Sequence, residues 1–137
     1  MTDITGENGR YARGLTARRE VLGDEHVDRA LGSATEFSGL AQEFVTEFCW
    51  GDVWTRPGLD RRTRSLINLA MLTALNRMHE FRVHVRGAVN NGCTTEEIRE
   101  TLLQAIVYCG APAGLESFRQ AQAVLDELAA ERAGAPA

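Results

Sequence analysis

The sequence predicts an all-α protein, a compact bundle of five to seven helices. Apolar residues recur three and four positions apart in almost every periodic segment, which is the spacing of one helix face. No run of alternating apolar and polar residues is long enough to suggest a strand. Of the 137 residues, 44% are hydrophobic and 25% are charged, as in an ordinary folded domain.

Three helical segments are expected in the first half of the chain, at about 10–22, 27–31 and 35–50. Gly23 and Gly51 follow the first and the third of these segments. Each is expected to end its helix, because glycine readily adopts the backbone conformations at which helices stop. Residues 54–58 are predicted to form a loop, since Pro57 and Gly58 together are a turn signal.

Four more helices are expected in the second half, at about 60–76, 79–91, 94–108 and 112–131. Asp60 is suited to cap the first of them, and Gly92 is suited to close the second. Thr94 and Glu97 have the spacing of a capping box, which predicts a helix start. Residues 66–72 are apolar nearly all round, so the helix that contains them is expected to be central and buried.

These boundaries predict one helical domain at residues 9–132, with a flexible N-terminus at 1–8 and a flexible tail at 133–137. No stretch approaches the roughly 18 apolar residues of a membrane span, and the first residues lack the apolar core of a signal peptide. A formal net charge of −4 offers no basic surface for nucleic acid. We therefore expect a cytoplasmic protein without a membrane or nucleic-acid partner.

Composition also excludes some kinds of chemistry. All 15 basic residues are arginine, so no lysine amine is present for a Schiff base or for pyridoxal phosphate. Arginine also suits the planar recognition of carboxylates better than lysine does. The three cysteines, Cys49, Cys93 and Cys109, form no CxxC pair, which excludes a thioredoxin-type redox centre and a four-cysteine zinc site. They are expected to be free, buried thiols.

The richest polar chemistry lies in residues 76–86. Glu80 and His84 are four positions apart, so on a helix their side chains lie on one face. A carboxylate beside an imidazole fixes the ring tautomer and raises the pKa of the ring, which favours a proton donor. Arg77 lies three residues before Glu80, on the same face if the helix includes it. The alternative is that these residues form a solvated helix face or an ion-pair strip at an interface.

Other candidates flank the predicted loop at 54–58. Trp54 and Arg56 are suited to form the wall of a pocket for a small anion, although such residues also pack loops against a core or a neighbouring subunit. Arg64 belongs to an arginine cluster at the start of the predicted helix 60–76. That cluster is either a solvated helix end or a set of groups that can bind a carboxylate.

Four longer motifs carry a resemblance to a known family: residues 50–65 (WGDVWTRPGLDRRTRS), 74–80 (ALNRMHE), 84–92 (HVRGAVNNG) and 108–113 (YCGAPA). With shorter matches around them, the likeness spans roughly residues 20–128. The chain resembles the 4-carboxymuconolactone decarboxylase family, within the alkylhydroperoxidase D-like superfamily. The superfamily's redox cysteines fall on Arg77 and Glu80, its histidine on His84 and its glutamate on Ser65. The resemblance therefore implies an alkylhydroperoxidase D-like helical fold without peroxidase chemistry.

The resemblance implies a carboxy-lyase that removes CO2 from 4-carboxymuconolactone, a dicarboxylate lactone, to give the β-ketoadipate enol-lactone in protocatechuate catabolism. It implies no cofactor and no metal, because the substrate carries its own electron sink. His84 and Glu80 become the expected catalytic pair. Arg77 is the first choice for binding a substrate carboxylate, and Arg56 and Arg64 are weaker choices, with Trp54 as an apolar wall.

The protein is also expected to self-associate, and two other kinds of function remain open. The resemblance implies assembly into a ring-like oligomer. A homo-oligomer is therefore expected, with six chains as the favoured number. One alternative function is a related decarboxylase or lactone-processing enzyme that acts on another substrate. The other is a non-redox binding protein of the same superfamily, in which Glu80 and His84 are only interface residues.

Overall fold

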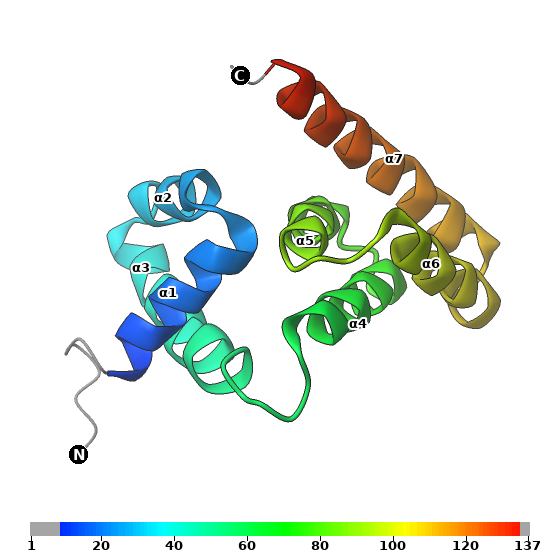
Figure 1. Cartoon of the computed structure of the whole chain (residues 1–137). Helices are drawn as coiled ribbons and strands as arrows, with labels where there is room; N and C mark the ends of the chain where they lie inside the picture. Colours follow the sequence, from blue (N-terminus) through cyan, green and yellow to red (C-terminus); the bar gives the residue numbers. More distant parts are fainter. Residues whose placement is uncertain (1–8, 135–137) are drawn as a thin grey trace. The chain divides into compact units, whose positions relative to one another are not determined.

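The computed structural model of the chain describes residues 9–134, and the part that it describes is helical without a β-strand (Figure 1). The predicted all-α class is therefore confirmed. The chain divides into two compact units, Met1–Arg61 and Arg62–Ala137, which are considered in turn. The flexibility predicted for residues 1–8 and 135–137 concerns positions outside the described residues. No helix between residues 9 and 134 is long and apolar enough to cross a bilayer.

The first unit consists of α1 (Arg10–Leu22), α2 (Asp24–Gly32), α3 (Glu36–Phe44) and the π-helical segment η1 (Val45–Val53). The bounds of α1 match the prediction. Gly23 has a φ of 89°, which explains why the helix stops there. Helix α2 is longer than the single turn expected at 27–31, because Asp24 and Glu25 add a first turn in which negative charge is favourable.

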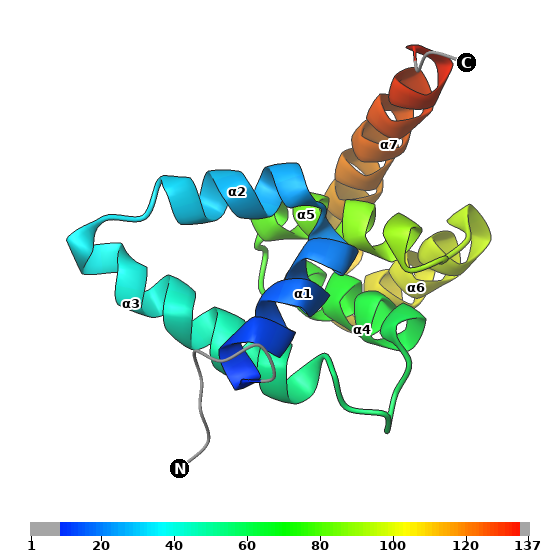
Figure 2. The ribbon, with the colours of Figure 1, turned by 60° about the vertical axis from the view of Figure 1, so that its left-hand side comes forward.

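Segment η1 corrects the prediction that Gly51 ends a helix. The chain continues from α3 into wider π-type turns that run to Val53, and Figure 2 shows η1 extending the rod of α3. Gly51 is buried inside this segment. The glycine is required by the packing of the segment and does not mark its end.

Helix α1 and η1 pack with their backbones in close approach. A Cβ atom at Gly14 would lie 1.9 Å from the carbonyl oxygen of Thr46, and one at Gly51 would lie 2.4 Å from the carbonyl oxygen of Arg10. Both distances are far below a van der Waals contact, so only glycine fits at either position. Two glycines, one on each side of the contact, therefore set the distance between these elements.

A buried arginine crosses the same contact. Arg18 of α1 is 6% exposed, and its two terminal nitrogens donate hydrogen bonds to Thr46 Oγ1 and Gln42 Oε1, each at 3.0 Å. Burial lowers the pKa of Arg18, since its hydrogen-bond acceptors are neutral groups. The guanidinium thus joins α1 to both α3 and η1.

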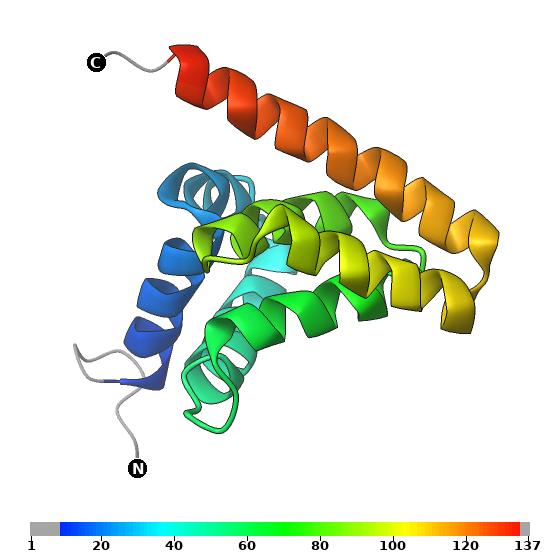
Figure 3. The ribbon, with the colours of Figure 1, turned by 45° about the vertical axis from the view of Figure 1, so that its right-hand side comes forward.

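The second unit consists of α4 (Arg61–Ala74), α5 (Met78–Asn90), α6 (Thr95–Cys109) and α7 (Ala111–Gly134). Helix α7 packs along α5 and α6, as Figure 3 shows. The helix expected at 60–76 ends at Ala74, because the chain turns at Asn76 with a φ of 57°. The last helix was expected to stop near Glu131, yet α7 includes Ala133 and Gly134, which the prediction placed in a flexible tail.

One apolar cluster forms the core of this unit. Its buried members are Leu69, Phe81, Val85, Ala88, Cys93, Ile98, Leu102, Ala121 and Val124. The expectation that residues 66–72 are buried all round is wrong for one face of α4. Leu69 is fully buried, but Ile67 and Met71 are 40% and 49% exposed. An apolar face without a covering helix therefore remains on α4.

Ion pairs connect α5 to α7. Arg82 and Arg86 both pair with Glu127, at 2.7 and 3.2 Å, and Arg86 also pairs with Glu131 at 2.8 Å. Hydrogen bonds from Arg86 and then Arg82 lower the pKa of Glu127, and hydrogen bonding to Arg86 lowers the pKa of Glu131. These pairs lie along one side of α5 and fix α7 against it.

The capping box predicted before α6 is confirmed. The backbone N–H of Glu97 donates to Thr94 Oγ1 at 3.0 Å, and the backbone N–H of Thr94 donates to Glu97 Oε1 at 2.9 Å. Arg62 also pairs with the carboxylate of Glu97. The hydrogen bond from the Thr94 backbone, followed by that from Arg62, lowers the pKa of Glu97. The start of α6 is therefore fixed by local sequence.

Candidate active site

The turn between α4 and α5 determines where Arg77 lies relative to α5. Asn76 adopts the left-handed conformation, and the backbone N–H of Arg77 donates to the carbonyl oxygen of Leu72 at 2.9 Å. This closes α4 tightly and makes Arg77 the N-cap residue of α5. Helix α5 begins at Met78, so Arg77 does not share a helix face with Glu80 as the spacing had allowed. Its side chain is exposed at the helix start.

Glu80 and His84 lie on consecutive turns of α5, as their spacing predicts. Glu80 is exposed in the first turn, where a carboxylate is favoured by the positive end of the helix dipole. His84 is half-buried. The hydrogen bond that the structure gives His84 comes from another helix, and a direct contact between Glu80 and His84 stays a prediction.

The imidazole of His84 instead has a partner on α4. Asn68 Nδ2 lies 3.4 Å from His84 Nδ1, and both side chains are half-buried. Sequence reasoning missed Asn68. The available signal was its position, because it is the only strongly polar residue in the apolar stretch 66–72. A polar side chain in such a stretch needs a hydrogen-bonding partner.

A second polar pair joins α4 to the end of α5. Asn91 Nδ2 donates to Ser65 Oγ at 2.8 Å, and Ser65 is fully buried. Arg64 precedes Ser65 and is half-buried, one helical turn before Asn68 on the same side of α4. The side of α4 that faces α5 thus carries arginine, serine and asparagine in sequence. Among the arginines proposed to bind a carboxylate, Arg64 is more buried than Arg77.

Trp54 and Arg56 belong to the first unit. Trp54 is buried and stacks on Trp50, with ring centroids 4.7 Å apart and an interplanar angle of 20°. Arg56 is exposed in the turn after η1, and its backbone N–H donates to the carbonyl oxygen of Val53 at 3.1 Å. The stacked pair gives Trp54 a rigid position, which suits an apolar wall.

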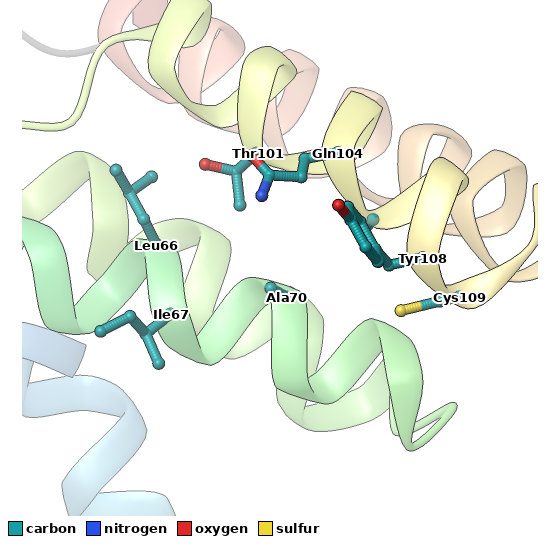
Figure 4. Close-up of a pocket in the computed structure, with 8 residues that line it drawn as sticks. Leu66, Ile67, Ala70, Thr101, Gln104, Tyr108 and Cys109 are labelled. Carbon is teal, nitrogen blue, oxygen red and sulfur yellow. The ribbon is translucent and has the colours of Figure 1, made fainter.

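A cavity of about 340 Å³ lies elsewhere in the second unit, between α4 and α6 (Figure 4). Its lining is Leu66, Ile67, Ala70, Thr101, Gln104, Ala105, Tyr108 and Cys109. Leu66 and Ala70 lie on the side of α4 opposite Asn68, since a helix turns by about 100° per residue. None of the predicted site residues lines this cavity, and no charged side chain does.

The cysteines are free thiols, as expected, but only one of the three is buried. Cys93 is buried and donates to the carbonyl oxygen of Arg62 at 3.5 Å, whereas Cys49 and Cys109 are exposed. The two exposed thiols correct the prediction: Cys49 lies on the exposed side of η1, and Cys109 is the last residue of α6. Across residues 9–134, no group of three or more histidine, cysteine or acidic side chains is arranged to hold a metal ion.

Comparison with known proteins identifies the family. The model of the carboxymuconolactone decarboxylase family matches residues 39–123. The chain is 44% identical over 119 residues to 4-carboxymuconolactone decarboxylase of Acinetobacter baylyi, an alignment that covers 87% of this chain and 89% of that protein. It is also 44% identical over 118 residues to nitrosuccinic acid decarboxylase of Metarhizium robertsii, covering 86% of this chain and 82% of the relative.

A third relative, a 4-carboxymuconolactone decarboxylase sequence from Pseudomonas putida, is 48% identical over 46 residues, which are 34% of this chain and 96% of that sequence. The region that the family model matches includes α4 and α5, which carry Asn68 and His84. Helical architecture, the family match over more than half of the chain and the two long alignments agree with one another. This chain belongs to the carboxymuconolactone decarboxylase family.

Proposed function

We propose that the protein is a carboxy-lyase that converts 4-carboxymuconolactone to the β-ketoadipate enol-lactone in protocatechuate catabolism. The observation that carries this proposal is the 44% identity to the Acinetobacter baylyi enzyme of that name, over nearly the whole of both chains. The cytoplasmic location expected from the sequence stays a prediction.

The reaction needs no electron sink from the protein. The departing carboxylate sits on a ring carbon that is conjugated, through the ring double bond, to the lactone carbonyl. When the carbon–carbon bond breaks and CO2 leaves, the electron pair moves into the carbonyl oxygen and gives a furan-like dienolate. A proton, ultimately from water, then adds to the carbon beside the carbonyl. We therefore propose that the enzyme works without a cofactor or metal.

The protein must stabilise the charge that develops on the lactone oxygen. We assign this task to the imidazole of His84, which is half-buried and held on the side of α5 that faces α4. A positioned donor of this kind is worth about 3 kcal/mol in the transition state. Glu80, one turn earlier on the same helix, supports the donor through its negative charge.

The protein must also hold a dianion. Guanidinium groups bind carboxylates through two parallel hydrogen bonds, which fix the orientation as well as the charge. Arg77 is assigned to the carboxylate that remains, because it follows the fixed turn at Asn76 and precedes Glu80 on α5. Arg64 and Arg56 are the further candidates. Trp54, fixed by its stacking on Trp50 in the first unit, stays a prediction from the sequence as an apolar wall.

A second candidate substrate has an observation of its own. The chain is as similar to a nitrosuccinic acid decarboxylase as it is to the Acinetobacter baylyi enzyme. Nitrosuccinic acid is also a dicarboxylic acid, and loss of the carboxylate beside its nitro group would place the electron pair on the nitro oxygens. The same site chemistry, a donor for a developing oxyanion and an arginine for the second carboxylate, serves both substrates.

One experiment separates the two candidates. Purified protein is incubated with enzymatically generated carboxymuconolactone and, separately, with nitrosuccinate, while ultraviolet absorbance and CO2 release are followed. The proposal expects kcat/KM for the lactone to exceed that for nitrosuccinate by at least about a hundredfold. The reverse ratio would transfer the assignment to the second candidate. No CO2 from either compound would contradict both.

We also propose that the protein is a homo-oligomer, with six chains expected. Large apolar side chains are exposed on α4, α6 and the start of α7, namely Ile67, Met71, Leu75, Leu103, Val107, Tyr108 and Leu115. Val107 and Tyr108 are 75% and 82% exposed, beside the uncharged cavity of Figure 4. Patches of this kind mark contact surfaces, and a second copy of this chain is the proposed occupant.

Light scattering tests the assembly. A mass near six times the chain mass of 15.1 kDa is expected, and a mass near 15.1 kDa at micromolar concentration would contradict self-association. Val107→Asp is expected to lower the mass, because it places a charge on the apolar surface. The matched control is Gln122→Asp on α7, an exposed position whose amide only bonds to Asp126 within its own helix.

A further inference from the structure

The contact between Asn68 and His84 determines what the imidazole can do. An amide nitrogen is a donor only, so Asn68 Nδ2, at 3.4 Å, meets His84 Nδ1 as an acceptor. A ring nitrogen that accepts a hydrogen bond carries no proton. The ring is then neutral, with its proton on Nε2, and Nε2 presents an N–H group on the opposite edge of the imidazole.

The position of Asn68 has a physical cause in the packing of α4. Two other polar residues of this helix, Ser65 and Thr73, form hydrogen bonds to other parts of the unit. Ser65 accepts from Asn91, and Thr73 Oγ1 donates to the carbonyl oxygen of Leu69 and shares a hydrogen bond with Ser117. Asn68 lies between these pairs, and its side chain contacts the ring of His84. The Ser65–Asn91 pair fixes the α4–α5 register that keeps Asn68 opposite His84.

We propose that Asn68 is a positioning residue that holds His84 as the neutral tautomer with its proton on Nε2. This inference rests on the proposed function, in which His84 stabilises the oxyanion. A neutral imidazole can act as an electrophilic donor to a developing oxyanion without giving up its proton. Asn68 thereby directs the N–H of His84 toward the oxygen that receives the electron pair.

Arg64 and Glu80 are charged residues one helical turn from Asn68 and from His84, respectively. Arg64 lies one turn before Asn68 on α4 and opposes a positive ring, whereas Glu80 lies one turn before His84 on α5 and favours one. Glu80 is exposed to solvent, which weakens the effect of its charge on the ring. We assign the choice of tautomer to the directed contact from Asn68, at 3.4 Å.

Two substitutions at position 68 test the proposal. Asn68→Ala removes the contact and is expected to lower kcat by about tenfold, with KM nearly unchanged. Asn68→Asp keeps the size but can only accept, so Nδ1 takes a proton. At an assay pH high enough to keep the ring neutral beside the carboxylate, Nε2 then loses its N–H. This variant is expected to lower kcat by about a hundredfold, as when an oxyanion donor is deleted. A kcat for Asn68→Asp equal to or above that of the wild type would overturn the proposal.

A spectroscopic readout tests the tautomer without substrate. Nitrogen-15 NMR of labelled wild-type protein at neutral pH distinguishes protonated from unprotonated ring nitrogens, and His26 and His79 are the internal references, since the chain has three histidines. A bare Nδ1 and a protonated Nε2 at His84 are expected. A proton on Nδ1 would overturn the proposal. This measurement stays decisive if neither variant folds.

The matched control is Gln120→Ala, which removes another amide that bonds across helices. Gln120 Oε1 accepts from Arg82 at 3.0 Å, between α7 and α5 and away from His84. Its kcat and the NMR signals of His84 are expected to equal those of the wild type. A loss of kcat as large as that of Asn68→Ala would contradict a specific role for Asn68. Wild-type protein without turnover would instead contradict the proposed function, while the NMR result still tests the tautomer.

Discussion

Replacing Gly14 with alanine should separate α1 from η1. The new Cβ would lie 1.9 Å from the carbonyl oxygen of Thr46 and 2.8 Å from the backbone nitrogen of Gly51. Both neighbours are backbone atoms, so no side chain can rotate away. The two elements must move apart by about 1.5 Å before an ordinary contact is restored. That movement also lengthens the 3.0 Å hydrogen bond from Arg18 to Thr46 beyond its useful range.

The magnitude follows from three contributions. Overpacking costs about 2 kcal/mol, and loss of a hydrogen bond to a buried charged group costs about 2 kcal/mol. Alanine returns about 1 kcal/mol through its helix propensity. The free energy of unfolding should therefore fall by about 3 kcal/mol, which lowers the melting temperature by about 10 °C in a chain of this size.

Thermal melts followed by far-ultraviolet circular dichroism measure this effect. They are recorded at two protein concentrations, because self-association makes the melting temperature depend on concentration. The matched control is Gly39→Ala in α3, where a Cβ would meet nothing within 4 Å. That variant should gain about 0.5–1 kcal/mol, because alanine loses less backbone freedom on folding. A Gly14→Ala protein that melts at or above the wild-type temperature would refute the packing argument.

Three further predictions concern catalysis, pH and metal. His84→Ala should lower kcat by about a hundredfold or more in steady-state assays without changing the melting temperature, whereas Arg77→Ala should mainly raise KM, because its carboxylate is bound throughout the reaction. The pKa of Glu127 is lowered from 4.5 by Arg86 and Arg82, so its ion pairs stabilise the folded chain above pH 4.5 and are lost as the pH falls below it. Urea unfolding as a function of pH should therefore show an acid loss of stability that Glu127→Gln reduces. Dialysis against a chelator should leave decarboxylation intact, and activity that returned only with added metal would contradict the mechanism.

The helix ends that sequence predicted best are those fixed by local signals. Gly23 ends α1 through its positive φ, and Thr94 with Glu97 begins α6 through two reciprocal hydrogen bonds. Both effects depend on residues within a few positions of the helix end. Such signals can be recognised in a single sequence, because the chemistry does not depend on a distant partner.

Segment η1 shows where the same reasoning fails. Gly51 has the residue type of a helix stop, yet its function is to admit the carbonyl oxygen of Arg10, which is 41 positions earlier in the chain. No local pattern distinguishes a glycine that ends a helix from one that allows another backbone to approach. The widened turns of η1 likewise cannot be deduced from propensity, since π-helices are rare and depend on packing.

The candidate site was predicted in its elements and not in its contacts. Spacing correctly placed Glu80 and His84 on one face of a helix, but a shared face does not establish a hydrogen bond. The partner of His84 is Asn68, which is 16 residues away in sequence and reaches the ring only because α4 packs beside α5. Its polarity within an apolar stretch was the only trace of this role in the sequence.

The two exposed thiols provide a chemical reporter of assembly. Cys109 lines the cavity between α4 and α6, within the surface proposed to contact a second copy, whereas Cys49 lies in η1. A thiol reagent should modify Cys109 quickly in dilute protein and slowly in concentrated protein, while Cys93 stays protected by burial. The ratio of modification at positions 109 and 49, measured by mass spectrometry across a dilution series, would convert cysteine reactivity into an association constant.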